Sequence, residues 1–268
     1  MIGIFDSGIG GLTVTKEVLK QLPEHQILYL GDTARMPYGN RSQELIYKFT
    51  EQAVDYLFKQ NCQLVVLACN TASAEALRKI QQEWLPKNYP DRKVLGVIRP
   101  LAEEAVKFSR FGRIGVVGTR GTISSGVYEK EIKTLNPKAK VLQQACPLLV
   151  PLIEEGWHKR PEIIRIMRYY LRPLKYSLID TLVLGCTHYS IMLKEFQDIC
   201  KKRITVLDSS KIVAEKLKDY LARHPETESK LTKGKEHRFL VTDLTDVFEK
   251  SAQDWLGQKI KLEKINLE

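Results

Sequence analysis

Two segments of the chain end a short apolar run with a cysteine that polar residues follow. They are Val65-Val66-Leu67-Ala68-Cys69-Asn70-Thr71-Ala72-Ser73 and Leu182-Val183-Leu184-Gly185-Cys186-Thr187-His188-Tyr189-Ser190. A short apolar run is typical of a buried parallel strand, and the polar residues after it predict the turn into a helix. Each thiol then lies at the carboxyl end of a strand, where open α/β sheets bind their ligands. We therefore predict one site that two thiols flank.

The position of these two thiols allows chemistry at sulfur, and two buried, unreactive cysteines are an equal alternative from the pattern alone. At a strand-to-helix turn the helix N-terminus stabilises a thiolate, so we expect their pKa to lie below the ordinary value of about 8.5. The other three cysteines, Cys62, Cys146 and Cys200, have no matching polar turn. We predict that these three are buried and unreactive.

Several uses of a thiol pair fit the sequence poorly. A redox pair needs the closer Cys-x-x-Cys spacing, and a zinc site needs two more ligands than Cys186 and His188 supply. Nucleophilic hydrolysis would leave the second thiol unexplained. Two thiols on opposite sides of one carbon atom explain both, because one removes a proton from one face while the other delivers a proton to the opposite face. Such a pair inverts a stereocentre. The sequence leaves open whether His188 takes part or only makes a structural hydrogen bond.

A glycine-rich turn follows the first predicted strand, in Phe5-Asp6-Ser7-Gly8-Ile9-Gly10-Gly11-Leu12. Thr13 occupies the position where a dinucleotide-binding fingerprint requires a third glycine, so no nicotinamide or flavin cofactor is predicted. Exposed N–H groups at the start of the helix could still hold a carboxylate or phosphate. Glycines needed only for the geometry of a tight turn are an equal alternative.

The composition is that of a folded globular protein rather than of a membrane or secreted protein. The chain has 268 residues with 43% hydrophobic content, enough for one large or two modest domains. Its apolar runs are far shorter than the roughly 20 residues that a membrane span requires. The predicted fold begins at Ile2, which leaves no room for a signal peptide, and an odd number of cysteines fits a reducing compartment. We expect a cytoplasmic protein with no membrane partner.

The charge balance is basic, with a net charge of +10. This charge favours acidic ligands or simply solubility. The basic runs at 201–203 and 230–238 contain no nucleic-acid-binding signature, so we interpret them as solvated surface and predict no nucleic-acid partner.

Short apolar runs recur between helical patterns along most of the chain. We predict strands at 2–5, 27–31, 64–68, 94–98, 114–118, 140–144, 181–185, 204–207 and 238–242. Apolar residues at helical spacing predict helices over 42–59, 163–171 and 211–221. The alternation indicates an α/β fold with mostly parallel sheets that helices flank.

A repeat divides this pattern into two halves. Ile2-Gly3-Ile4-Phe5-Asp6-Ser7 resembles Ile114-Gly115-Val116-Val117-Gly118-Thr119, and the two cysteine segments follow in the same order. We therefore predict two domains that face each other across a cleft. The first comprises 1–96 and 208–268, because the C-terminal part returns to it, and the second comprises 97–207. Pro86 to Asp91 is predicted as a linker region before the crossing.

At this point the motifs resemble those of a known family. Asp6-Ser7-Gly8-Ile9-Gly10-Gly11-Leu12, Asp32-Thr33-Ala34-Arg35-Met36-Pro37-Tyr38-Gly39, Ala68-Cys69-Asn70-Thr71-Ala72 and Gly185-Cys186-Thr187-His188-Tyr189 together resemble glutamate racemase, as do Val150-Pro151-Leu152-Ile153-Glu154 and Asp208-Ser209. The cysteine motifs alone would fit the wider aspartate/glutamate racemase superfamily. The first two segments make the resemblance to glutamate racemase specific.

The resemblance implies two pseudo-symmetric α/β domains with the active site in the cleft between them. It implies racemisation of glutamate without cofactor or metal, which supplies D-glutamate for peptidoglycan. Cys69 and Cys186 would be the catalytic acid/bases, the first for D-glutamate and the second for L-glutamate. Asp6, Glu154 and His188 would position the thiols or the substrate and assist proton transfer. Substrate contacts would come from Asp6, Ser7, Tyr38, Gly39, Asn70, Thr71, Thr119, Thr187 and His188. Without the resemblance, Tyr38 and Asn70 would be interpreted as ordinary turn residues.

Two rival hypotheses remain beside this one. The first is a racemase for aspartate or another acidic amino acid. The second is a ligand- or nucleic-acid-binding protein that kept the fold and lost catalysis, and only the basic charge supports it. The sequence does not decide whether the chain forms a homodimer.

Overall fold

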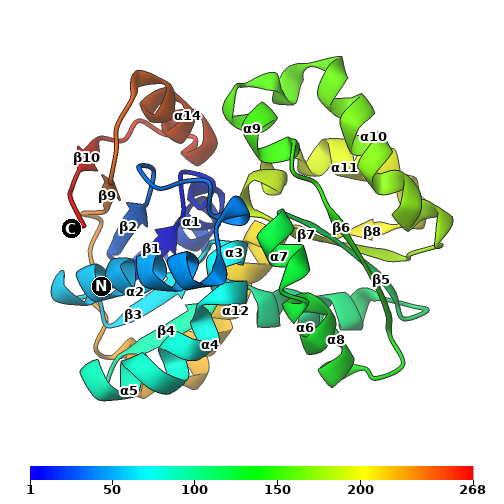
Figure 1. The fold of residues 1–268 in the computed structure, drawn as a ribbon. Coiled ribbons are helices and arrows are strands. Elements are labelled where there is room, and N and C mark those ends of the chain that lie inside the picture. The colour runs from blue at the N-terminus through cyan, green and yellow to red at the C-terminus, as the bar shows by residue number, and fades with distance from the viewer. Residues whose placement is uncertain (268) are drawn as a thin grey trace.

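Within residues 1–267, which the computed structural model describes, ten strands form two sheets (Figure 1). The strands are β1 (Ile2–Asp6), β2 (Ile27–Gly31), β3 (Leu64–Leu67), β4 (Lys93–Gly96), β5 (Arg113–Gly118), β6 (Lys140–Ala145), β7 (Thr181–Gly185), β8 (Thr205–Val206), β9 (Arg238–Val241) and β10 (Leu262–Lys264). Neighbouring strands of each sheet pair in parallel. The central strands are buried along their whole length, as expected where helices cover both faces of a parallel sheet.

The two sheets repeat one strand order. The six-stranded sheet runs β10-β9-β2-β1-β3-β4 and the four-stranded sheet runs β6-β5-β7-β8. The order β2-β1-β3-β4 in the larger sheet is therefore reproduced in the smaller sheet. There β5 takes the place of β1, and β7 takes the place of β3. This correspondence confirms the predicted duplication, and it places Cys69 and Cys186 after equivalent strands. We call the larger sheet with its helices the first domain and the smaller sheet with its helices the second domain.

Helices cover both sheets and fill the boundary between them. The α-helices are α1 (Leu12–Gln21), α2 (Gln43–Lys59), α3 (Asn70–Glu75), α4 (Leu77–Lys79), α5 (Leu85–Asn88), α6 (Ile98–Phe108), α7 (Arg120–Ser124), α8 (Val127–Leu135), α9 (Leu149–Glu154), α10 (Pro161–Tyr176), α11 (Leu193–Cys200), α12 (Ser209–Arg223), α13 (Pro225–Glu228) and α14 (Asp246–Leu256). Short 3-10 helices are η1 (Tyr38–Asn40), η3 (Trp157–Lys159), η4 (Thr187–Met192) and η5 (Lys201–Arg203), and η2 (Ile80–Trp84) is a π-helix.

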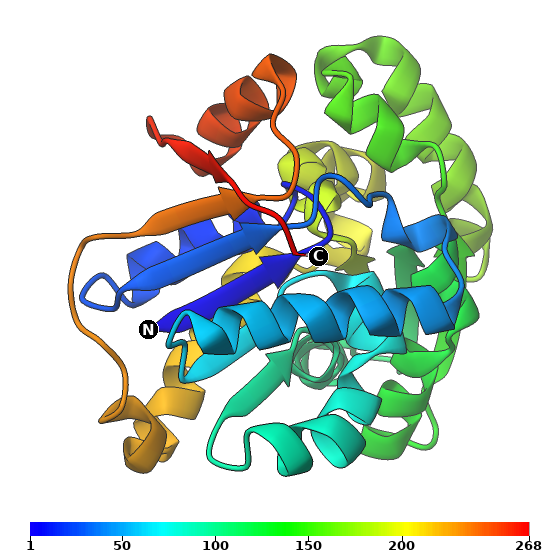
Figure 2. The ribbon, with the colours of Figure 1, turned by 60° about the vertical axis from the view of Figure 1, so that its left-hand side comes forward.

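The chain passes between the domains twice. It leaves the first sheet after β4 through α6, which packs on α8, and it returns after β8 through α12, which packs on α1 and α6. Strands β9 and β10 then extend the first sheet beside β2, so the C-terminal segment lies against the N-terminal half (Figure 2). The expected return of the C-terminal part to the first sheet is confirmed for these strands. The exact residue boundaries of the two domains stay a prediction.

Some expectations about single elements are wrong. Pro86 to Asp91 is not a linker between domains, because it forms the end of α5 and the turn into β4, which pairs with β3 in the same sheet. The strand predicted over 94–98 ends at Gly96, since Val97 caps the following helix α6. Strand β10 has no counterpart among the predictions, because its three residues carry too short a pattern to be recognised.

The three cysteines outside the repeated motifs are buried, as predicted. Cys62 is fully buried in the core of the first domain, and its sulfur packs close to Gly3. Burial raises the pKa of the Cys62 thiol to about 12. This side chain therefore acts as a small apolar group in the core.

We predict that Cys62→Ser lowers the free energy of unfolding by about 1–3 kcal/mol, because it buries a hydroxyl group among apolar side chains. Urea denaturation measures this change. Lys48→Gln, at an exposed position of α2, serves as the control and should leave the midpoint unchanged. Equal stability of Cys62→Ser and the unmodified protein would contradict the assignment of Cys62 to the apolar core.

Candidate active site

The glycine-rich turn after β1 lets the two domains approach each other closely. A Cβ atom on Gly10 would lie 2.5 Å from both Thr187 Oγ1 and His188 Nδ1 in the second domain, and one on Gly11 would lie 2.5 Å from the Asp6 Cβ. Both contacts are shorter than real Cβ atoms tolerate, so neither position accepts a side chain without displacement of its neighbours. Close packing against these neighbours explains Gly10 and Gly11, and a carboxylate site at the N–H groups of this turn stays a prediction.

Asp6 ends β1 and is buried beneath this turn. Its carboxylate accepts hydrogen bonds from the Gly8 N–H at 3.1 Å and from the Thr187 hydroxyl at 3.4 Å. Burial raises the pKa of Asp6, although His188 and these hydrogen bonds oppose the effect. Asp6 therefore connects the first domain to the residue that follows Cys186.

Cys69 caps the N-terminus of α3 and is almost completely buried. Its sulfur accepts a hydrogen bond from the Ala72 N–H at 3.4 Å and donates one to the Ser7 hydroxyl at 3.3 Å. Burial and the charge of Asp6 nevertheless raise the pKa of Cys69 to about 12. The expected lowering by the helix N-terminus is therefore wrong for Cys69, because the loss of solvation outweighs the two hydrogen bonds.

Cys186 has a different set of neighbours. Its sulfur lies 3.8 Å from His188 Nδ1, and His188 Nε2 lies 2.9 Å from Glu154 Oε1 in α9. Burial alone would lower the pKa of His188, but Cys186 and Glu154 hold it well above its ordinary value. The His188 ring also meets Trp255 of α14 edge to face, with ring centroids 5.5 Å apart. The Cys186 sulfur therefore lies next to an imidazole that favours its charged form.

The two thiols open into one cavity between the domains. In the first domain it is lined by Ser7, Tyr38, Gly39, Cys69, Asn70 and Thr71, and in the second by Thr119, Glu154, Cys186, Thr187 and His188. Thus the structure brings together all the residues predicted for the site, with Asp6 directly behind Thr187. The cavity has a volume of only about 30 Å³.

Hydroxyl groups join the domains at the edge of this cavity. Thr71 Oγ1 lies 3.0 Å from Thr119 Oγ1 and 3.2 Å from Thr122 Oγ1. Gly39 packs against Thr119 so closely that a Cβ atom there would lie 2.7 Å from the Thr119 Cβ. The roles of Thr71, Thr119 and Gly39 as substrate contacts stay predictions, since the structure shows them in contact with one another.

A few cavity residues were not predicted. Gly8, Met36, Pro37 and Val150 also line it, and all four lie inside the motif segments that carry the family resemblance. Trp255 lies outside these motifs. Its contact with His188 depends on how α14 packs, and no local pattern predicts that contact.

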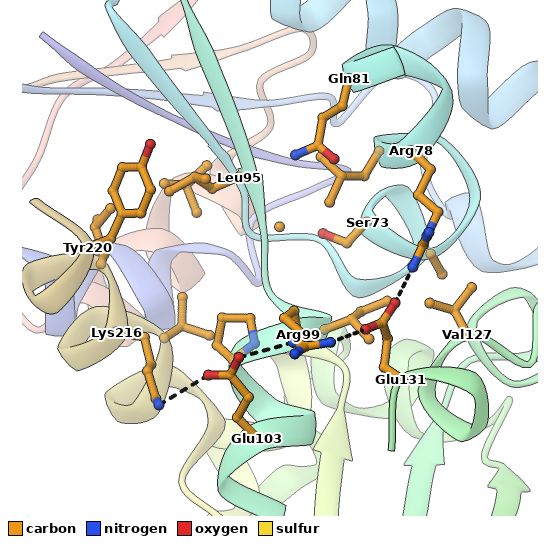
Figure 3. Close-up of a pocket in the computed structure, with 18 of the residues that line it drawn as sticks. Ser73, Arg78, Gln81, Leu95, Arg99, Glu103, Val127, Glu131, Lys216 and Tyr220 are labelled. Carbon is orange, nitrogen blue, oxygen red and sulfur yellow. Dashed lines mark hydrogen bonds and ion pairs between the residues drawn. The ribbon is translucent and has the colours of Figure 1, made fainter. Parts of the chain in front are cut away.

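A larger cavity of about 490 Å³ lies elsewhere along the domain boundary (Figure 3). Most of its charged side chains pair with one another, since Arg78 and Arg99 both contact Glu131, and Lys216 contacts Glu103. Neither thiol lines it. We therefore place the active site in the smaller cavity.

Two further searches covered the described residues 1–267. They contain no group of three or more His, Cys, Asp or Glu side chains that could hold a metal ion. No helix among them is both long and apolar enough to cross a membrane.

Comparison with known proteins identifies the family. The family described as Asp/Glu/Hydantoin racemase matches residues 2–217. A protein named glutamate racemase from Geobacter metallireducens is 41% identical over 263 residues, which cover 97% of this chain and 93% of the relative. The chain belongs to the glutamate racemase family.

Solved structures of this family share the whole fold. The crystal structure of glutamate racemase isoform RacE1 from Bacillus anthracis has a TM-score of 0.91 at 36% identity, covering 100% of this chain and 97% of that one. The glutamate racemase of Francisella tularensis, solved in complex with D-glutamate, has a TM-score of 0.89 at 33% identity with the same coverage. The predicted fold class and family resemblance are thus confirmed.

We predict that Glu154→Gln lowers the pKa of His188, because it removes the carboxylate that stabilises the charged imidazole. NMR titration of ¹³C-labelled histidine measures the midpoint. A raised histidine pKa contributes stability that is complete below the unfolded value of about 6.5 and is lost as the pH rises through the folded pKa. The variant should therefore lose most stability near pH 6, and the difference should shrink at higher pH.

Glu155→Gln, at the next and exposed position, is the matched control and should leave the His188 titration unchanged. A Glu154→Gln midpoint equal to that of the unmodified protein would show that Glu154 does not charge His188.

Proposed function

We propose that the protein interconverts L- and D-glutamate by proton transfer between two cysteines. One observation carries this proposal: Cys69 and Cys186 follow equivalent strands of two repeated sheets and open into one cavity from opposite domains. A carbon atom held between them can lose a proton to one sulfur and receive a proton from the other. The result is inversion at that carbon.

The unequal surroundings of the thiols support a division of roles. For L-glutamate, a Cys186 thiolate beside charged His188 would take the α-proton, so that the C–H bond breaks and an S–H bond forms. Cys69, kept as a neutral thiol by its raised pKa, would deliver its proton to the opposite face of the carbanion. The proton then rests on Cys186 and the negative charge on Cys69, which is the starting form for D-glutamate. These forms agree with the roles that the family resemblance implies for the two cysteines.

The cavity offers neutral hydrogen-bond donors for the carboxylates of the substrate. These donors are the hydroxyls of Ser7, Thr71 and Thr187, the amide of Asn70 and backbone N–H groups. Among the described residues that line the cavity there is no lysine or arginine. Donors placed around the α-carboxylate would stabilise the negative charge that develops when the α-proton leaves, most effectively where water is excluded.

The relatives support glutamate rather than aspartate as the substrate. Proteins named glutamate racemase match nearly the full chain at about 40% identity, whereas the aspartate racemase of Picrophilus torridus shares 18% identity, which indicates the fold alone. Supply of D-glutamate for peptidoglycan synthesis and a cytoplasmic location belong to the same proposal. Whether two copies of the chain form a homodimer stays open.

We predict that the protein, without added cofactor, racemises L-glutamate in deuterated water and introduces deuterium at the α-carbon. Loss of optical rotation and proton NMR measure the two effects. Cys69→Ser and Cys186→Ser should each lower the rate by about 100-fold or more, because each removes one of the two acid/bases. Cys200→Ser is the matched control, since this cysteine lies in α11 away from the cavity, and it should keep the rate.

A parallel reaction with L-aspartate tests the rival hypothesis of an aspartate racemase. Faster racemisation of aspartate than of glutamate would show that aspartate is the substrate. No exchange with any acidic amino acid would favour the binding-protein hypothesis. Full activity of either active-site cysteine variant would rule out the two-thiol mechanism.

The small free volume of the cavity implies that the domains separate to admit the substrate. About 30 Å³ accessible to water centres corresponds to two or three water molecules, and glutamate has ten non-hydrogen atoms. We predict that D-glutamate lowers the radius of gyration measured by solution scattering, because it draws an open form into this closed one. Sodium chloride at matched ionic strength is the control, and identical profiles with and without glutamate would count against opening.

A further inference from the structure

One tyrosine from the second domain contacts both thiol-bearing segments. Tyr128, in α8, is fully buried, and its hydroxyl donates a hydrogen bond to Asn70 Oδ1 at 2.6 Å. Its ring packs on Gly185, where a Cβ atom would lie 3.1 Å from Tyr128 Cε2. Asn70 directly follows Cys69 and Gly185 directly precedes Cys186. The Tyr128 side chain therefore contacts the residues next to both cysteines.

The hydrogen bond decides which end of the Asn70 amide faces the cavity. Burial raises the pKa of Tyr128, so its hydroxyl keeps the proton and acts as donor toward the amide oxygen. Within residues 1–267 the Asn70 side-chain nitrogen has no hydrogen-bond partner, and Asn70 lines the cavity. An amide with its oxygen bound in this way presents its N–H₂ group as a donor. Without Tyr128, the amide could turn and present its oxygen to a carboxylate instead.

We propose that Tyr128 is a positioning residue that orients the Asn70 amide to donate to a carboxylate of the substrate. This inference rests on the proposed function, because it assumes that an acidic amino acid binds between Cys69 and Cys186. It adds a residue outside the motifs that carry the family resemblance.

The helix that carries Tyr128 is itself held across the domain boundary. Glu131 lies one turn further along α8 on the same face, is buried, and pairs with Arg78 of α4 and with Arg99 of α6 at 3.1 Å (Figure 3). Tyr128 and Glu131 thus both reach toward the first domain, one to the active site and one to the larger cavity. The ion pairs thus join α8 to α4 and α6 next to the helix turn that carries Tyr128.

The test is a steady-state comparison of Tyr128→Phe, Asn70→Ala and the double variant with D-glutamate. Tyr128→Phe should raise KM about three- to tenfold, the effect of one hydrogen bond. kcat should stay within about twofold where Asn70 holds the side-chain carboxylate, whose charge is constant in the reaction, and should fall as well where Asn70 holds the α-carboxylate. Asn70→Ala should raise KM at least as much. The double variant should match Asn70→Ala alone, because Tyr128 acts only through Asn70.

Controls separate positioning from a structural role. Tyr89→Phe removes a tyrosine hydroxyl that donates to Asp55 at 2.7 Å, outside the cavity, and should leave KM unchanged. A Tyr128→Phe variant with lower thermal stability but the KM of the unmodified protein would overturn the inference, and so would additive effects in the double variant. If Tyr128→Phe does not fold, Asn70→Asp keeps an oxygen for Tyr128 but has no N–H donor, and an unchanged KM would overturn the inference.

Failure of the proposed function has a different signature. If the unmodified protein does not racemise glutamate, the proposed function is wrong before Tyr128 is considered. If it racemises glutamate and Asn70→Ala leaves KM unchanged, the two-thiol proposal stands and the inference about Tyr128 is wrong.

Discussion

The site depends on how closely the ends of two equivalent strands approach each other. Gly10 leaves no room for a side chain against Thr187 and His188, and Gly39 leaves none against Thr119. These contacts bring Cys69 from the first sheet and Cys186 from the second into one cavity. A larger side chain at either glycine would push the domains apart and separate the two sulfurs. The geometry of the proposed proton transfer is therefore set by backbone packing between the domains.

The close approach of the two domains also excludes water from the site, and this loss of solvation changes the pKa values of the side chains there. Burial raises the pKa values of Cys69 and Asp6, which favours their neutral forms. His188 has the opposite outcome, because Glu154 and Cys186 compensate the loss of solvation. One side of the cavity therefore favours a neutral thiol, whereas on the other side the cysteine sulfur lies next to a charged imidazole. This asymmetry arises although the two strands and their turns are repeats of one pattern.

The repeated strand order explains why both domains carry a cysteine at the same place, and the residues that differ after each cysteine explain why the surroundings of the two thiols differ. The strand order β2-β1-β3-β4 recurs as β6-β5-β7-β8, so each half supplies a cysteine at the same place. The residues after each cysteine differ: Asn70 contacts Tyr128 of the other domain, whereas His188 contacts Glu154 within its own domain. The second domain is also tied to the first by Glu131 with Arg78 and by Thr187 with Asp6. These contacts make the two halves a single site.

The sequence by itself determined the local features: the strands, the turns after them, the position of each cysteine at a strand end and the duplication. These follow from hydrophobic patterns of a few residues and from motifs that stand close together in the chain. Tertiary structure alone decided the pKa of Cys69 and the contacts of Tyr128 and Trp255. Desolvation and charge depend on neighbours that are distant in sequence, such as Asp6 for Cys69, and no local pattern specifies which distant side chains meet.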